Sequence, residues 1–125
     1  QLTFAQEVKV DGAVIVSTPQ DLALLDVKRG IEMFNKTGVK ILGLISNMSY
    51  FKGDDGKKYN IFGDDGVKKT AEEFKVKFLG ELALNKDLRI ASDRGEPLTF
   101  SQPGHEVSKQ FESLAQLIKL SLINK

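Results

Sequence analysis

The sequence contains no cysteine and no tryptophan, and its only histidine is His105. Without thiolates, the chain itself can form no disulfide, no zinc ribbon and no cysteine-ligated iron–sulfur cluster. Its uninterrupted apolar runs are each only a few residues long, so none predicts a transmembrane helix. No signal or transit pattern is visible within it. His105 follows Pro103 and Gly104, a setting that favours a surface loop or a helix start.

The sequence also lacks an excess of charge of either sign. Lysine and arginine number 18, aspartate and glutamate 17, and the net charge is +1. This balance gives no general attraction to nucleic acid or to a membrane surface, and we expect no nucleic-acid partner. The phosphate-loop pattern G-x-x-x-x-G-K-[ST] is absent as well. What is present is a chain of 125 residues, 41% of them hydrophobic, which is typical of one ordinary soluble domain.

Three short apolar runs predict the strands of this domain. They are residues 13–17 (AVIVS), 39–46 (VKILGLIS) and 76–82 (VKFLGEL). Runs with apolar residues on both faces are typical of strands that are buried in a parallel sheet and covered by helices.

The intervening segments predict helices. After the first run, Thr18 can cap a helix, Pro19 suits its first position and Gly38 can end it. Residues 64–75 predict a second helix, and a third is expected from Glu106 to Ile123 because apolar residues recur there at helical spacing.

Alternation of strands and helices indicates an α/β fold with a mostly parallel sheet. The segment between the third strand and the last helix is expected to be irregular. A complete doubly wound domain usually has five or more strands, whereas this chain predicts about three with flanking helices. Residues 1–125 are therefore expected to form a single partial domain, about half of a doubly wound sheet.

The sequence Gly-Asp-Asp-Gly occurs twice, at 53–56 and 63–66. Neither copy fits the ligand spacing of an EF-hand, and adjacent aspartates in an extended chain point to opposite sides. Asp-Gly between extended segments favours a hairpin turn, so we interpret the first copy as a turn. The second copy is expected to open a helix, where acidic residues are favoured. No metal site is predicted.

Three stretches carry a family resemblance: STPQDLALLDVKRGIEMF (17–34), LGLISNMSYF (42–51) and LRIASDRGEPL (88–98). Their order and spacing resemble the Mrp / nucleotide-binding-protein-like P-loop ATPases, which carry iron–sulfur clusters to apoproteins. The residues SQP at 101–103 are similar to the mitochondrial branch that serves respiratory complex I. A ParA/MinD-type positioning ATPase would share the fold but matches NMSYF and ASDRGEP less well.

The resemblance implies that this chain is the C-terminal half of a P-loop NTPase domain, with Walker A and Walker B upstream. The full-length protein would bind ATP. Phosphoryl transfer depends on positioning and charge neutralisation at the phosphates, so the chain alone is predicted to be inactive, and no catalytic residue is assigned. An intracellular location is implied, in the mitochondrial matrix or alternatively in the cytoplasm.

The same resemblance suggests three nucleotide-binding residues. Asn47, directly after a strand, would contact the adenine edge, although asparagine is also common in such turns. Pro97 would pack against the base, with an ordinary loop proline as the alternative. Asp21 would lie near the phosphates or the dimer interface, although a carboxylate at a helix start is explained by capping alone.

Cluster carriers of this family place Cys-x-x-Cys after Asn-Met-Ser-x-Phe and hold one [4Fe–4S] cluster between two subunits. Here the corresponding positions are Gly53 and Gly56. The family therefore implies a cluster, a homodimer and iron–sulfur apoprotein partners, but this cysteine-free chain does not support the cluster. Two hypotheses stay open. The chain could supply the adenine pocket and dimer surface of a cluster carrier, or it could be a non-enzymatic interaction module derived from one.

Overall fold

A computed structural model of the chain describes residues 9–123. Its main sheet contains β1 (Ala13–Ser17), β2 (Ile41–Ser46) and β5 (Phe78–Glu81) in the order β1-β2-β5. Both strand pairs are parallel. The α/β fold with a parallel three-stranded sheet is confirmed, and each strand lies within its predicted run.

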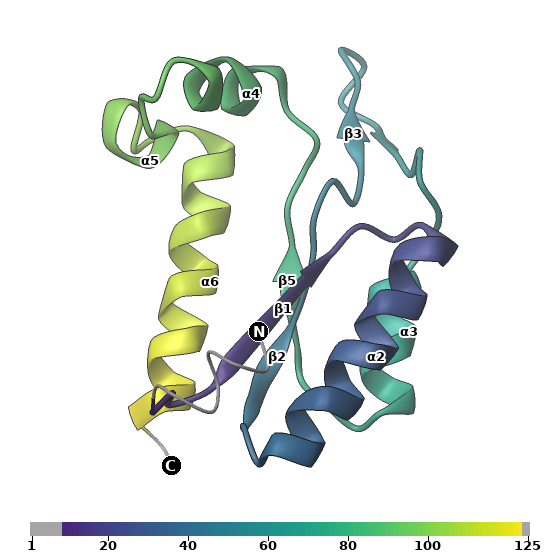
Figure 1. Cartoon of the computed structure of the whole chain (residues 1–125). Helices are drawn as coiled ribbons and strands as arrows, with labels where there is room; N and C mark the ends of the chain where they lie inside the picture. Colours follow the sequence, from purple (N-terminus) through teal and green to yellow (C-terminus); the bar gives the residue numbers. More distant parts are fainter. Residues whose placement is uncertain (1–8, 124–125) are drawn as a thin grey trace.

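Helices cover both faces of this sheet (Figure 1). α2 (Asp21–Thr37) and α3 (Gly66–Glu73) lie on one face, and α6 (Glu106–Ile123) lies on the other. Successive residues of β2 point to opposite faces, so Leu44 and Ile45 belong to two different cores. This explains why the strand carries apolar residues on both faces until it ends at Ser46.

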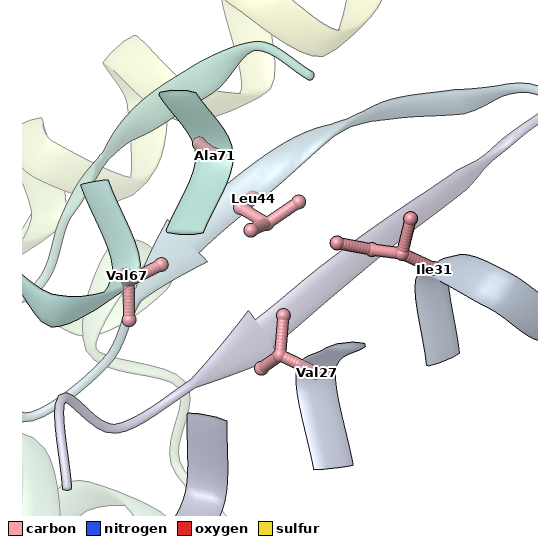
Figure 2. Close-up of a cluster of buried hydrophobic side chains, with 5 residues drawn as sticks. All are labelled: Val27, Ile31, Leu44, Val67 and Ala71. Carbon is pink, nitrogen blue, oxygen red and sulfur yellow. The ribbon is translucent and has the colours of Figure 1, made fainter. Parts of the chain in front are cut away.

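Figure 2 shows the larger core, which lies between β2 and the helix pair α2 and α3. Its buried members are Val27, Ile31, Leu44, Val67 and Ala71. The core under α6 is formed by Ile45, Leu79, Leu82 and Leu114. The core under α6 uses the apolar face that the helical spacing predicts, and α6 has the predicted bounds.

The predicted start of α2 is wrong. Gln20 is the N-cap residue, its backbone is extended, and its side chain makes no capping hydrogen bond. The helix therefore begins at Asp21 rather than at Pro19. The hydroxyl of Thr18 donates instead to Gln20 Oε1 at 3.2 Å. The predicted end is confirmed, because Gly38 adopts a left-handed conformation with φ 73° and its N–H donates to the Phe34 carbonyl.

The expectation of an irregular segment before α6 is also wrong. This segment forms α4 (Lys86–Asp93) and a single turn, α5 (Leu98–Ser101). Asn85 caps α4, since its Oδ1 accepts hydrogen bonds from the backbone N–H groups of Asp87 and Leu88 at 2.9 and 3.2 Å. Both elements pack on the start of α6 in a small third core of Ala91, Leu98 and Val107.

The two Gly-Asp-Asp-Gly copies have the predicted local structures. The first joins β3 (Phe51–Lys52) to the antiparallel β4 (Lys58–Tyr59), forming a hairpin that projects beyond the main sheet (Figure 1). The second leads into α3, which spans Gly66–Glu73 and is shorter at both ends than the predicted 64–75. It begins later because Asp65 has φ 50° and lies outside the helix. Within residues 9–123, no helix combines the length and apolar character that crossing a membrane requires.

Candidate functional site

The three parallel strands end together and form one polar edge. Ser17 pairs with Ser46, and Ser46 pairs with Glu81, so the last residues of the strands form a row across the sheet. The row continues one residue further, because Asn47 N–H donates to the Ser17 carbonyl at 2.7 Å. Ligands of open α/β sheets bind beyond this carboxyl edge. It is therefore the candidate site.

Asn47 has a fixed side chain at this edge. Its Oδ1 accepts a hydrogen bond from the Met48 N–H at 3.0 Å, and Met48 adopts a left-handed backbone with φ 50°. A carboxamide oxygen can accept two hydrogen bonds, and its NH₂ group can donate two. The Nδ2 group has no hydrogen-bond partner among residues 9–123, so the amide keeps both donor and acceptor capacity.

A groove of about 440 Å³ extends from Asn47 between the sheet and α6. Its walls are mostly apolar and come from the sheet, α4 and α6. They include Val16, Ile45, Leu88, Ser92 and Phe111. An apolar groove with one polar amide at its border is typical of small-molecule sites in proteins.

The structure does not bring the other two predicted residues into this groove. Asp21 is exposed as the first residue of α2. Pro97 is exposed before α5, where its carbonyl accepts from the N–H groups of Phe100 and Ser101, both at 3.0 Å. The binding roles of Asn47, Asp21 and Pro97 remain predictions.

Sequence reasoning missed Glu81, which connects the loop after β2 to the hairpin. Ser49 Oγ donates to Glu81 Oε2 at 2.8 Å, and Lys58 Nζ lies 3.4 Å from Glu81 Oε1. The only sequence signal was a charged residue at the end of an apolar strand. The contact partners lie 32 and 23 residues away, so no local pattern could have identified them.

Tyr50 anchors the same loop to α6. Gln110 Nε2 donates to the Tyr50 hydroxyl at 2.6 Å, while Gln110 Oε1 accepts from the Ala83 N–H at 3.4 Å. The Tyr50 ring is buried, and Lys58 Nζ lies 4.3 Å from its centroid, in cation–π geometry. The loop after β2 is thus held by both β5 and α6.

Hydrogen bonds within the turn hold the hairpin tip closed. The Tyr59 hydroxyl donates to Asp55 Oδ2 at 2.5 Å, and the Lys57 N–H donates to Asp55 Oδ1 at 2.9 Å. The bond from Tyr59, followed by the bond from Lys57, lowers the pKa of the Asp55 carboxyl. The same Asp55 carboxylate raises the pKa of the Tyr59 phenol, because it stabilises the protonated hydroxyl.

The residues of this tip do not fit a [4Fe–4S] cluster. The chain has no thiolate, and a Cβ atom at Gly53 would lie 2.8 Å from both Asp55 Oδ1 and Tyr59 Cε2. Gly56 has φ +79°, a conformation that strains any other residue. In the described part of the chain, no group of three or more histidine, aspartate or glutamate residues could hold a metal ion.

Comparisons with known proteins agree on one family. A ParA model, described as NUBPL iron-transfer P-loop NTPase, matches residues 1–119. The mouse iron-sulfur cluster transfer protein NUBPL is 47% identical over 116 residues, which cover 92% of this chain and 36% of the relative. An Arabidopsis thaliana iron-sulfur protein required for NADH dehydrogenase, mitochondrial, is 47% identical over 117 residues, 93% of this chain and 37% of that protein.

A solved structure shares the fold. It is the nucleotide-binding protein from Archaeoglobus fulgidus in complex with ADP, with a TM-score of 0.66 and 38% identity. The match covers 75% of this chain and 39% of that one. The chain spans about a third of the length of the curated relatives it matches.

Proposed function

The chain belongs to the NUBPL iron-transfer P-loop NTPase family, and from this premise we propose that it forms the nucleoside-binding part of an iron–sulfur cluster carrier. The remainder of that carrier would bind the phosphates and Mg²⁺, since these 125 residues contain no phosphate loop. ATP would be the nucleotide of the full-length protein. This chain alone would neither hold the phosphates nor hydrolyse them.

The position of Asn47 carries the proposal. Adenine presents an amino donor beside a ring-nitrogen acceptor, and an asparagine amide offers the complementary pair. Asn47 stands at the carboxyl edge of the sheet with its Nδ2 group available, and its Oδ1 can accept a second hydrogen bond beside the one from Met48. The ADP complex of the A. fulgidus protein, which has the same fold, supports nucleotide as the ligand class.

The free edge of β1 supports docking of the phosphate-binding part at that strand. Within residues 9–123, β1 pairs only with β2. A hollow of about 470 Å³ lies between β1 and α2, and its lining includes every residue from Val14 to Thr18. Because consecutive side chains alternate between faces, this lining marks the strand's edge. An apolar edge in a parallel sheet is suited to a further parallel strand.

The cargo would be an iron–sulfur cluster, as the names of the relatives indicate, and the recipients would be iron–sulfur apoproteins. Thiolates for that cluster must come from outside this chain, because it has no cysteine. We propose a mitochondrial location, with the cytoplasm as the alternative, and the name of the Arabidopsis relative supports the first. Detection in purified mitochondria would support this location, and confinement to the cytoplasmic fraction would contradict it.

The dimer surface would be the carboxyl edge itself, because elements at this end of the sheet carry exposed apolar side chains. Leu22 lies in the first turn of α2, Tyr59 belongs to the hairpin and Ile61 follows it, and all three are exposed. A two-fold interface uses the same patch on both subunits, so a single patch of this kind is sufficient. Light scattering with and without nucleotide would test dimerisation.

A hybrid protein tests the proposed function. In it, this chain replaces the matched segment of the A. fulgidus protein, so that the phosphate-binding part is present. We expect the hybrid to bind ADP and this chain alone to bind none. A folded hybrid without ADP affinity would contradict the proposal and favour a non-enzymatic interaction module. Micromolar binding by the isolated chain would contradict the division of the site between two parts.

A further inference from the structure

The hairpin and the candidate nucleotide edge are joined by one short loop. Asn47 lies at the carboxyl edge of the sheet, and Phe51, four residues later, begins the hairpin. The backbone of this loop follows the end of β5: the Ser49 N–H donates to the Leu82 carbonyl at 2.9 Å, and the Leu84 N–H donates to the Tyr50 carbonyl at 2.8 Å. The loop therefore has a fixed path.

Glu81 holds both ends of this connection with its two carboxylate oxygens. One oxygen accepts from Ser49, two residues after Asn47, and the other lies within 3.4 Å of Lys58 on β4. Lys58 also lies over the ring of Tyr50, the residue next to Ser49. The Glu81 carboxylate, the Lys58 ammonium and the buried Tyr50 ring thus join the hairpin to the loop that carries Asn47.

We propose that Glu81 is a positioning residue that couples adenine binding at Asn47 to the order of the β3–β4 hairpin. This inference rests on the proposed function. A base held by Asn47 restrains the loop, and through Glu81 the restraint extends to Lys58 and the hairpin. Coupling of this kind is reciprocal, so any partner that orders the hairpin also tightens nucleotide binding.

A second ion pair on the hairpin provides a matched control. Lys52 Nζ lies 3.5 Å from Glu106 Oε2, a separation close to the 3.4 Å between Lys58 and Glu81. Both pairs are largely exposed and tie the hairpin to the body of the protein. The Lys52 pair ends on α6, however, and does not contact the loop from Asn47 to Tyr50. Its loss should loosen the hairpin without changing the adenine site.

The test measures ADP affinity by calorimetry in the hybrid protein. We expect Glu81→Ala to weaken binding about fivefold and Lys58→Met about twofold, because these half-exposed charged contacts are each modest. Glu81→Gln keeps an acceptor for Ser49 and should recover part of the loss. Lys52→Met should leave ADP affinity unchanged. If Lys52→Met weakens binding as much as Glu81→Ala, the effect is general loosening and the proposal is wrong.

Hydrogen exchange of the hairpin amides tests reciprocity. In the unsubstituted hybrid, saturating ADP should slow exchange at residues 53–57, and Glu81→Ala should abolish this protection while the protein stays folded. Protection that survives Glu81→Ala would overturn the proposal. A hybrid that binds ADP but is insensitive to Glu81 would refute only this inference, whereas a hybrid that binds no ADP would refute the proposed function itself.

Discussion

Replacing Asn47 by aspartate should separate its local structural role from its role at the ligand. The aspartate keeps an oxygen that can accept from the Met48 N–H, so the left-handed turn at Met48 stays supported. It loses the Nδ2 donor and presents an acceptor to the ring nitrogen of adenine. One hydrogen bond contributes about 0.5–1.5 kcal/mol, and an unsatisfied acceptor costs about 1–3 kcal/mol. We therefore expect ADP affinity to fall by at least about 10-fold, with the melting temperature unchanged.

Asn47→Ala is the companion variant. It removes the bond to Met48 as well, so it should weaken ADP binding and also lower the stability of the hybrid protein by about 1 kcal/mol. Calorimetric titration with ADP and with GDP measures the affinities, and thermal unfolding without nucleotide measures stability. If Asn47→Asp binds ADP as tightly as the unsubstituted hybrid, Asn47 does not contact the base and the reasoning from the amide is refuted.

Three further predictions concern the chain itself. Leu44→Ala, at the fully buried centre of the larger core, should lower the free energy of unfolding by about 3–5 kcal/mol in urea titrations, and a change below about 1 kcal/mol would contradict the packing described. Asn85→Ala should cost about 1 kcal/mol by the same measurement, because α4 loses its cap. Tyr59→Phe should return the pKa of Asp55 toward its ordinary value of 3.8 in carboxyl NMR titrations. The folded-state pKa of Asp55 is lowered, so its stabilising contribution is fully present above the unfolded-state pKa and is lost as the pH falls through the folded-state pKa. An unchanged titration would exclude the Tyr59 bond.

The main sheet and its covering helices could be predicted because they follow local rules. Residues 13–17 and 41–46 are apolar on both faces, which a strand requires only when helices cover both sides. The apolar spacing in 106–123 fixed α6 for a similar reason, and Gly38 ended α2 because its left-handed conformation favours glycine.

The segment from 86 to 101 could not be predicted by the same rules. α4 is eight residues long and mostly exposed, and α5 is a single turn, so neither carries a long apolar stripe. Their burial depends on Val107 of α6, which is a tertiary contact. Asn85, a favoured N-cap residue, was a usable local signal for the start of α4.

The candidate site also contains residues whose position follows from the sequence and residues that only the fold brings together. The position of Asn47 directly after a buried strand could be predicted from the apolar pattern, whereas its binding role came only from the family resemblance and stays a prediction. Glu81 could not be predicted, because its role depends on Ser49 and Lys58, which only the fold brings together. Thr18 shows the opposite error: it is a good capping residue, but the extended backbone at Gln20 prevents the helix from starting there.

The most direct test of the central claim is the NMR signal of the Asn47 side-chain amide in the hybrid protein. Selective ¹⁵N labelling of asparagine, with Asn47→Asp for assignment, identifies the Nδ2 protons. On addition of ADP we expect these two signals to shift and to show cross-peaks to adenine protons. Saturation with ADP that leaves the Asn47 signals unmoved, while other residues of the hybrid respond, would show that this chain does not supply the nucleoside pocket.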